Sequence, residues 1–195
     1  MEVNGNKMDA SYYQDLHDNN DAFKKNNWLL KDFDKLKELK TSVSSVLELG
    51  CGNGRFLELA NTIWDDVTGV DWAKSSHIED LITNHHNIKF IQADVTALQL
   101  DRVYDLVVSA DFLEHLAPDD LPNVIQGMLR IGKMNHHKIA CYDDGHSHLS
   151  IFPSEKWLEL FRSQPGGENV RIIQEELRKG REGHIVVTIS NAEFD

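Results

Sequence analysis

Two short segments of the sequence carry acidic and imidazole side chains at spacings that suit proton transfer or metal binding. In the first, SADFLEHLAPDD, Asp111 and His115 lie four residues apart, with Glu114 beside them. Residues four apart share one face of a helical turn, so the Asp111 and His115 side chains are predicted to meet. Side chains of these types exchange protons with a bound ligand.

The second segment, CYDDGHSHLSIF, contains His146 and His148, which point the same way in an extended chain. Both segments follow strand-like runs, so they are expected at the same rim of a sheet. Two carboxylates and two imidazoles that converge there are suited to act as a general base or to hold a divalent cation. The simpler alternative is that the acidic residues cap a helix and the histidine only orients a ligand.

A third segment, VLELGCGNGRFLEL, places Gly50, Gly52 and Gly54 between a strand-like run and a helical pattern. Glycine adopts backbone angles that a Cβ atom forbids, and it lets a ligand touch the main chain. A helix that starts near Arg55 directs unpaired N–H groups toward the same place. The segment therefore predicts a flat or anionic ligand against residues 50–54, and the alternative is a tight turn without a ligand.

Two common nucleotide-binding patterns do not fit this segment. Arg55 stands where the dinucleotide fingerprint G-x-G-x-x-G needs its third glycine, and no Gly-Lys-Ser/Thr of a P-loop follows. Asp71 lies about twenty residues further on, at the end of a strand-like run, where an acidic residue binds ribose hydroxyls. The ligand is therefore expected to be nucleotide-like but not a dinucleotide.

These segments belong to a regular alternation of strand-like and helical stretches. The predicted strands are residues 44–50, 66–71, 87–95, 104–110, 136–144, 169–177 and 184–190. The predicted helices between them are residues 54–64, 75–85, 119–133 and 153–163. Strands separated by helices indicate a parallel sheet covered on both faces, and the closing hairpin makes the last strand antiparallel. The expected fold is α/β, a doubly wound, mostly parallel, seven-stranded sheet of the Rossmann-like type.

The first forty residues differ from the rest of the chain. Residues 12–40 are expected to form one or two helices with an apolar stripe, after a polar tail. We expect residues 1–40 to form a helical segment and a candidate lid over the site, with Tyr12 and Tyr13 in it. Residues 41–195 are expected to form the ligand-binding domain.

The pattern E-x-G-x-G-x-G in VLELGCGNG, with Glu48 two residues before Gly50, resembles the first motif of the class I S-adenosylmethionine-dependent methyltransferases. The resemblance extends from Tyr12 to Ser190, because the order of the predicted elements agrees with that family. It implies the fold described above and S-adenosylmethionine as the cofactor.

The resemblance also implies roles for single residues. Asp71 accepts hydrogen bonds from the ribose hydroxyls, Trp72 stacks on the adenine face, and Asp94 accepts a hydrogen bond from the adenine amino group. The fourth strand brings Ser109 and Ala110 to the methionine end. The full set of implied cofactor-binding residues is Glu48, Gly50, Cys51, Gly52, Gly54, Asp71, Trp72, Asp94, Val95, Ser109 and Ala110.

Methyl transfer to a hydroxyl oxygen requires that the hydroxyl lose its proton. The D-x-x-E-H segment and a distant histidine resemble the metal element of small-RNA 2′-O-methyltransferases and of ubiquinone-pathway O-methyltransferases. That resemblance implies a divalent cation held by Asp111, Glu114, His115 and His148. Asp111 reaches less far than the glutamate that it replaces, so the preferred hypothesis is a metal-free base. His115 is the first candidate for this base, and His146 or His148 is the next.

The composition limits the partners. The chain has 195 residues and a formal net charge of −12, which disfavours nucleic acid and anionic membranes. The first ten residues lack the apolar region of a signal peptide, and no apolar run approaches the roughly 18 residues of a membrane span. Cys51 and Cys141 lack metal-type or redox spacing and are expected to be reduced thiols in a cytoplasmic protein.

The preferred function is therefore S-adenosylmethionine-dependent O-methylation of a small molecule or sugar. One alternative is a metal-assisted RNA 2′-O-methyltransferase, and another is a catalytically idle binding or activating subunit on the same fold. The oligomeric state is left open. The other histidines are expected at the surface or in hinges: His17, His77, His85, His86, His136, His137 and His184.

Overall fold

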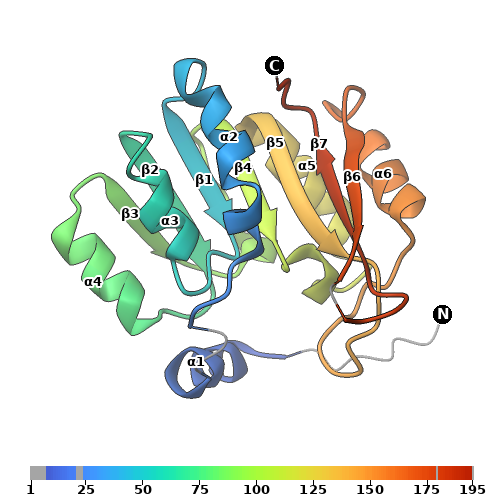
Figure 1. The fold of residues 1–195 in the computed structure, drawn as a ribbon, viewed down its shortest axis with the longest axis horizontal. Coiled ribbons are helices and arrows are strands. Elements are labelled where there is room, and N and C mark those ends of the chain that lie inside the picture. Colours follow the sequence, from blue (N-terminus) through green and yellow to red (C-terminus); the bar gives the residue numbers. More distant parts are fainter. Residues whose placement is uncertain (1–7, 21–23, 179, 195) are drawn as a thin grey trace.

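Seven strands form one sheet through the middle of the protein (Figure 1). The computed structural model describes residues 8–20, 24–178 and 180–194. The strands are β1 (Ser45–Leu49), β2 (Asp66–Asp71), β3 (Ile88–Gln92), β4 (Tyr104–Ala110), β5 (Gly132–Ala140), β6 (Arg171–Leu177) and β7 (Ile185–Ser190). They lie in the order β3-β2-β1-β4-β5-β7-β6, and β7 runs antiparallel to both of its neighbours. The predicted mostly parallel sheet with an antiparallel last strand is confirmed.

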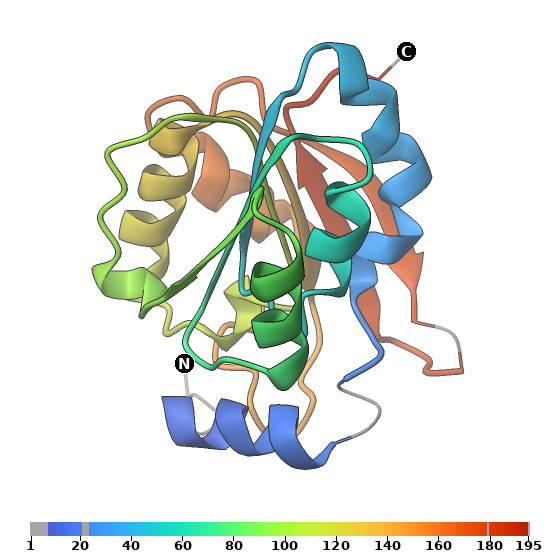
Figure 2. The ribbon, with the colours of Figure 1, turned by 90° about the vertical axis from the view of Figure 1, so that its left-hand side faces the viewer.

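Helices cover both faces of this sheet (Figure 2). The α-helices are α1 (Ala10–Asn19), α2 (Phe33–Leu36), α3 (Arg55–Ala60), α4 (Ser76–Asn84), α5 (Leu121–Ile131) and α6 (Ser154–Arg162). Short 3₁₀ turns are η1 (Trp28–Lys31), η2 (Lys37–Thr41), η3 (Val95–Ala97) and η4 (Leu113–His115). The helices α5 and α6 pack on one face, and α2, α3 and α4 pack on the other.

The central strands are apolar on both sides, as strands between two helical layers must be. Leu47, Leu49 and Val107 pack in the core beneath α5 and α6. Val46 and Leu106 pack in the opposite core, beneath α3 and α4. Neighbouring residues of β1 and β4 thus belong to different cores, because successive side chains of a strand point to opposite faces.

The chain reverses its direction of winding next to β1. It adds β2 and β3 on one side of β1, and then crosses to add β4 and β5 on the other side. In such sheets, ligands bind at the carboxyl ends of the strands near this switch point. Those ends lie at the lower edge in Figure 1, and helix α1 lies across them.

The predicted boundary between the helix at 119–133 and the strand at 136–144 is wrong. Helix α5 ends at Ile131 and β5 begins at Gly132, with no loop between them. A Cβ atom on Gly132 would stand 2.8 Å from Val107 Cγ2, so glycine allows this close transition. Asn135 is buried, and its Nδ2 donates to the Gly132 carbonyl at 3.1 Å. A strand whose first half buries polar groups lacks the apolar pattern on which the prediction relied.

The expected surface position of three histidines is also wrong, because His17, His136 and His137 are at most 3% exposed. His136 Nε2 lies 3.1 Å from Asp32 Oδ2, and His137 Nδ1 lies 2.9 Å from Ser109 Oγ. Burial lowers the pKa of His137 to about 3, so this ring is neutral. Hydrogen bonds to partners distant in sequence replace the water that polar rings in the interior would otherwise need.

The N-terminal segment divides into two parts. Residues 28–41 pack on the sheet through Leu29, Leu36 and Leu39, so this part belongs to the core. Helix α1 instead lies over the carboxyl ends of the strands (Figure 2). Residues 1–7 and 21–23 of the expected lid lie outside the described residues. Within the described ranges, no helix is both long and apolar enough to cross a membrane.

Candidate active site

A cavity of about 870 Å³, partly open to solvent, lies at the switch point between the strand ends and helix α1. Six of the residues predicted to bind a cofactor line it: Gly50, Gly52, Asp71, Trp72, Asp94 and Val95. Tyr13 and His17 of α1 form the opposite wall, and Asp111 and His115 close one end. We call this space the cofactor cavity.

The three glycines of the loop after β1 all have positive φ angles, 68° at Gly50, 52° at Gly52 and 76° at Gly54, but they have different surroundings. A Cβ atom on Gly50 would stand 2.5 Å from Phe112, and one on Gly54 would stand 2.5 Å from Ile78. Near Gly52 the closest atom would be His17 Cε1, at 3.8 Å. Gly50 and Gly54 are therefore needed for packing, and Gly52 is the glycine that leaves room for a ligand against the main chain.

Asp71 connects the end of β2 to this loop. Its Oδ2 accepts a hydrogen bond from the Gly52 N–H at 2.8 Å, and its Oδ1 accepts one from the Ala73 N–H at 3.0 Å. Burial raises the pKa of Asp71 above its ordinary value, while these N–H groups act in the opposite direction. Each carboxylate oxygen can accept a further hydrogen bond, so the group is oriented toward the cavity and retains capacity for a diol.

Asp94 lies at the end of the loop after β3, where it caps the η3 turn. Its Oδ1 accepts hydrogen bonds from the Thr96 N–H at 2.9 Å and the Thr96 hydroxyl at 2.7 Å. Within the described residues, Oδ2 has no hydrogen bond, so it can accept one from a ligand amine. Trp72 and Val95 line the same end of the cavity and supply apolar surface for a flat ring.

Among the described residues that line the cofactor cavity, five predicted ones are missing: Glu48, Cys51, Gly54, Ser109 and Ala110. Glu48 is 1% exposed, and its Oε1 accepts a hydrogen bond from Asn27 Nδ2 at 2.8 Å. Burial holds the pKa of Glu48 well above its usual range. Cys51 is fully buried behind Gly69, and Ser109 pairs with a buried histidine. The buried side chains of Glu48, Cys51 and Ser109 therefore belong to the interior beneath the cavity and not to its lining.

A second cavity of about 610 Å³ adjoins the first and shares Tyr13, Asp111 and His115 with it. Its other walls come from α1, the loop after β5 and the end of β6. The residues found only in this second cavity are Tyr12, Leu16, Tyr142, Asp144, Ser147, His148 and Arg178. We call it the acceptor cavity.

Asp111 stands between the two cavities because of an unusual backbone angle. Its φ is 53°, and its N–H donates to the Lys138 carbonyl at 3.1 Å. The chain therefore turns sharply after β4 and holds the carboxyl group at the cavity wall. Desolvation raises the pKa of Asp111 to about 6, although nearby His148 and Arg178 act to lower it. At neutral pH the group is mostly ionised but is poised near its titration.

Within the described residues, the Nε2 atoms of His115 and His148 have no hydrogen bond, and that of His148 lies 3.9 Å from Asp144 Oδ2. His148 Nδ1 lies 2.6 Å from the Tyr142 carbonyl, and His115 Nδ1 lies 3.3 Å from the Ser147 carbonyl. A carbonyl only accepts hydrogen bonds, so Nδ1 carries the proton in both rings. Burial lowers the pKa of both imidazoles. Two neutral rings therefore present basic nitrogens at neutral pH.

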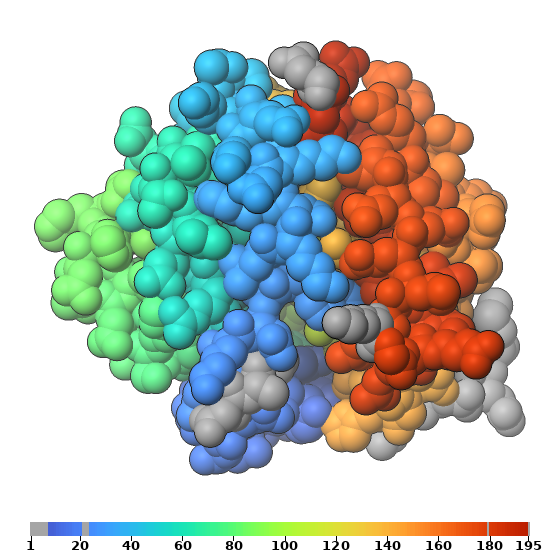
Figure 3. Space-filling view, viewed as in Figure 1, coloured from blue at the N-terminus to red at the C-terminus, as the bar shows by residue number. Residues whose placement is uncertain are grey.

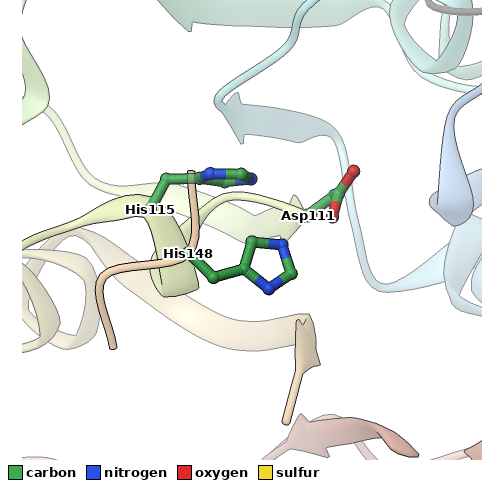
Figure 4. A group of neighbouring side chains, drawn as sticks. All are labelled: Asp111, His115 and His148. Carbon is green, nitrogen blue, oxygen red and sulfur yellow. The ribbon is translucent and has the colours of Figure 1, made fainter. Parts of the chain in front are cut away.

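The two imidazoles and the Asp111 carboxylate converge from two segments, Asp111 and His115 from the turn after β4 and His148 from the loop after β5 (Figure 4). Their ligand-type atoms all lie within 4.8 Å of one another, and the two rings lie edge to face with centroids 4.9 Å apart. This donor set suits proton transfer and also fits a divalent cation.

Glu114 and His146 do not join this group, contrary to prediction. Glu114 is fully buried, and its Oε1 accepts a hydrogen bond from the Ala140 N–H at 2.6 Å. It lies in a 3₁₀ turn, so it points to β5 instead of the cavity. His146 lies at the outside, where its Nδ1 is 3.3 Å from Tyr12 Oη. The loop around it is curled about Asp144 and not extended, so alternation does not align His146 with His148.

Sequence reasoning missed several residues of the site. Tyr142 and Asp144 lie inside a segment that was singled out for its histidines, and His17 was expected at the surface. Arg178 comes from the turn after β6, and no local motif marks it. Tyr13, expected in the lid, lies in both cavities.

Comparisons with known proteins agree with this geometry. Residues 46–135 match a family model described as a methyltransferase domain. The chain is 29% identical over 156 residues to a malonyl-[acyl-carrier protein] O-methyltransferase of Bacillus anthracis, covering 78% of this chain and 54% of that protein. It is 29% identical over 119 residues to a ubiquinone biosynthesis O-methyltransferase of Rickettsia prowazekii (strain Madrid E), covering 55% and 47%. The chain thus spans about half the length of these relatives.

Solved structures share the fold. A 1,6-didemethyltoxoflavin-N1-methyltransferase of Burkholderia thailandensis, with S-adenosylhomocysteine bound, aligns with a TM-score of 0.72 at 14% identity, over 94% of this chain and 87% of that one. The N-methyltransferase NodS of Bradyrhizobium japonicum WM9, also with S-adenosylhomocysteine, aligns with a TM-score of 0.67 at 18% identity, over 94% and 98%.

The sheet, its switch point and the cavity beside Gly52 define an α/β protein with a ligand-sized cavity where such sheets bind their ligands. Residues 46–135 match the methyltransferase domain model, and the chain shares its fold with solved S-adenosylhomocysteine-bound methyltransferases. These findings agree with the predicted family and with S-adenosylmethionine as the predicted cofactor.

Proposed function

We propose that this chain methylates an oxygen atom of a small molecule held in the acceptor cavity. The observation that carries the proposal is that the two cavities share Tyr13, Asp111 and His115. A methyl donor in one cavity and an acceptor in the other would meet at this shared wall, and orientation supplies most of the rate enhancement in a direct transfer. The curated relatives that match the chain are named O-methyltransferases, which favours oxygen as the acceptor.

The cofactor cavity suits S-adenosylmethionine. Gly52 leaves room for close approach, Asp71 offers oriented carboxylate oxygens to the ribose hydroxyls, and Asp94 offers a free oxygen to the adenine amino group. The aromatic ring of Tyr13 lies where it would face the sulfonium, which favours a nearby aromatic surface. Helix α1, with Tyr12 and Tyr13, serves as the lid in this proposal.

His115 is the preferred general base. It lines both cavities, is neutral at physiological pH, and keeps its Nε2 lone pair because Nδ1 is bonded to a carbonyl. After the ring takes the acceptor's proton, the ionised Asp111 close by stabilises the resulting imidazolium. His148 is the second candidate for the same role.

A second version of the mechanism uses a divalent cation at Asp111, His115 and His148. The fit is supported by the convergence of their ligand atoms within 4.8 Å. Both rings also donate Nδ1–H to a carbonyl, as metal-bound histidines commonly do. A cation there would lower the pKa of the acceptor hydroxyl. Asp111 extends into the group, so its short side chain no longer argues against this version.

The decisive experiment measures conversion of S-adenosylmethionine to S-adenosylhomocysteine across metabolite pools, with and without a chelator. We expect turnover with a small acceptor, and calorimetry should detect S-adenosylhomocysteine binding. His115→Ala should slow turnover about a hundredfold, because a positioned base contributes on that order. His85→Ala, which changes an exposed ring at the C-terminal end of α4, is the matched control and should leave the rate unchanged.

The outcomes separate the alternatives. Loss of turnover on chelation, with recovery on adding back manganese or zinc, supports the cation version, and insensitivity supports the metal-free base. Turnover of RNA in place of small molecules would favour the RNA alternative, although the net charge of −12 opposes it. Cofactor binding without turnover of any pool would favour an idle subunit. No cofactor binding would refute the proposal.

A further inference from the structure

Arg178 is the only lysine or arginine among the described residues that line the acceptor cavity. It follows the last residue of β6, and its backbone is held on both sides of the turn. Its N–H donates to the His184 carbonyl at 2.8 Å, and its carbonyl accepts from the Arg181 N–H at 3.0 Å. The position of this side chain at the cavity is therefore set by the hairpin.

The guanidinium of Arg178 is oriented by aromatic residues. Its Nη1 donates to the Tyr142 hydroxyl at 2.8 Å, and its central carbon lies 5.8 Å from the Trp28 ring centre. The Tyr142 ring in turn contacts His148, with centroids 5.2 Å apart. The guanidinium thus belongs to the same packed group as the imidazoles. It forms no direct ion pair with a carboxylate of the described residues, although it lies near enough to Asp111 to lower the pKa of that group.

Among the described residues, most of the hydrogen-bonding capacity of this exposed guanidinium has no protein partner. It has five N–H donors, and one of them meets Tyr142. Within the described residues, no carboxylate lies within 4.0 Å of it, although the chain has 32 acidic residues against 20 basic ones. Asp144 of the same cavity is already engaged by the N–H groups of residues 146–148 and by a serine hydroxyl.

We infer that the methyl acceptor is an acid, whose carboxylate or phosphate group pairs with Arg178 while its reacting oxygen lies beside His115. The inference rests on the proposed function and adds the substrate class. The planar fork of arginine matches both anions in a bidentate geometry. In a protein with a net charge of −12, a small anion needs such a local cation to bind. An uncharged acceptor would not pair with the guanidinium. The site would therefore select acidic acceptors over uncharged ones.

The first test is direct binding of simple anions to protein saturated with S-adenosylhomocysteine. Acetate and inorganic phosphate serve as probes for the two anion classes, and nuclear magnetic resonance titration follows the Arg178 and Tyr142 signals. We expect Arg178→Met to weaken binding of the preferred anion by at least tenfold and to leave S-adenosylhomocysteine affinity unchanged. Arg181→Met removes the same charge from the same turn and should bind the anion as the wild type does.

The second test compares acceptors in matched pairs. Hydroxycarboxylates and sugar phosphates are assayed beside their uncharged amides or dephosphorylated counterparts. We expect the acids to be methylated preferentially, with KM raised about 10- to 100-fold in Arg178→Met and partly restored in Arg178→Lys. If the hydroxycarboxylates lose affinity in Arg178→Met, the group that Arg178 binds is a carboxylate. If the sugar phosphates lose affinity, it is a phosphate.

Two results would overturn the inference. One is anion binding that is equal in the wild type and Arg178→Met. The other is a set of uncharged acceptors methylated as well as the acids, with Arg178→Met lowering both alike, which would show that Arg178 only holds Tyr142. In either case S-adenosylhomocysteine binding and turnover would still stand, so failure of the inference is distinguishable from failure of the proposed function.

Discussion

Asp71 joins two parts of the cofactor cavity through a single carboxylate, since one oxygen accepts from Gly52 and the other from Ala73. Asparagine has one acceptor oxygen and cannot satisfy both N–H groups. Hydrogen bonds to a charged group contribute about 1.5–3 kcal/mol, so Asp71→Asn should weaken S-adenosylhomocysteine binding by roughly 10- to 100-fold. Calorimetry measures the change. Asp66→Asn, at the other end of β2, is the control and should bind normally.

Asp111 is the one residue besides glycine with positive φ in the described ranges. Asparagine tolerates this conformation well and carries no charge to desolvate. The pKa of Asp111 rises from 3.8 to about 6 on folding, so its contribution to stability is lost as pH rises through about 6. We expect Asp111→Asn to be more stable than the wild type by about 1 kcal/mol at pH 8, after allowance for solvent screening at the cavity wall.

The difference should shrink toward pH 4, and denaturant unfolding in the presence of a chelator from pH 4 to pH 8 measures it. Asp119→Asn, at an exposed position, is the control. Methyl transfer should fall in Asp111→Asn even though the fold gains stability, because a carboxylate on a strained backbone at the cavity wall is retained for function. A constant stability difference across this pH range would contradict the prediction.

At the scale of elements, helix α1 depends on contacts for its place. A ten-residue helix has little stability of its own. In the space-filling view, α1 and the loop after β5 lie together at the lower edge (Figure 3), and Tyr12 Oη lies 3.3 Å from His146 Nδ1. Gln14 adds two hydrogen bonds with the Lys74 backbone, each 3.0 Å long.

Gln14→Ala should therefore loosen α1 without unfolding the sheet. Two hydrogen bonds contribute about 1–3 kcal/mol, so hydrogen exchange within Ala10–Asn19 should accelerate about tenfold or more. The KM for S-adenosylmethionine should rise, because α1 forms one wall of its cavity. Asn19→Ala should change neither quantity, because among the described residues the Asn19 side chain bonds only to Asp15 within the helix. Equal exchange rates in Gln14→Ala and the wild type would show that other contacts hold α1.

At the scale of the whole molecule, a buried ion cluster joins the N-terminal segment to β5 and β6. Lys138 has a side chain only 1% exposed, and its Nζ lies 3.0 Å from Asp32 Oδ1 and 3.2 Å from Glu176 Oε1. His136 Nε2 lies 3.1 Å from the other Asp32 oxygen. Removing one partner of a buried pair strands the other charge in a medium that solvates it poorly.

We expect Asp32→Ala to destabilise the protein by about 3–5 kcal/mol. The double variant Asp32→Ala/Lys138→Met should cost less than the sum of the two single changes, since no buried charge is left without a partner. Urea unfolding of the four proteins gives the coupling free energy. Additive effects would mean that the cluster does not act as a unit.

Much of the fold follows from local patterns. The strands β2 and β4 have the predicted bounds, Asp66–Asp71 and Tyr104–Ala110. The run in β4 is mostly apolar because a strand buried on both faces carries apolar side chains on both. The glycine loop also predicts the start of α3 at Arg55. The sequence did not predict the first half of β5 as a strand. Its buried polar groups are stabilised by partners far away in sequence, as His136 is by Asp32.

For the site, the sequence by itself determined which residues reach the rim, since parallel strands bring their carboxyl ends together. Gly52, Asp71 and Asp94 lie together in the cofactor cavity for that reason. Tertiary structure alone decided which side chains face one another in the irregular loops, where residue spacing carries no direction. It turned Glu114 toward β5, and it brought Arg178 into the acceptor cavity through the pairing of β6 with β7.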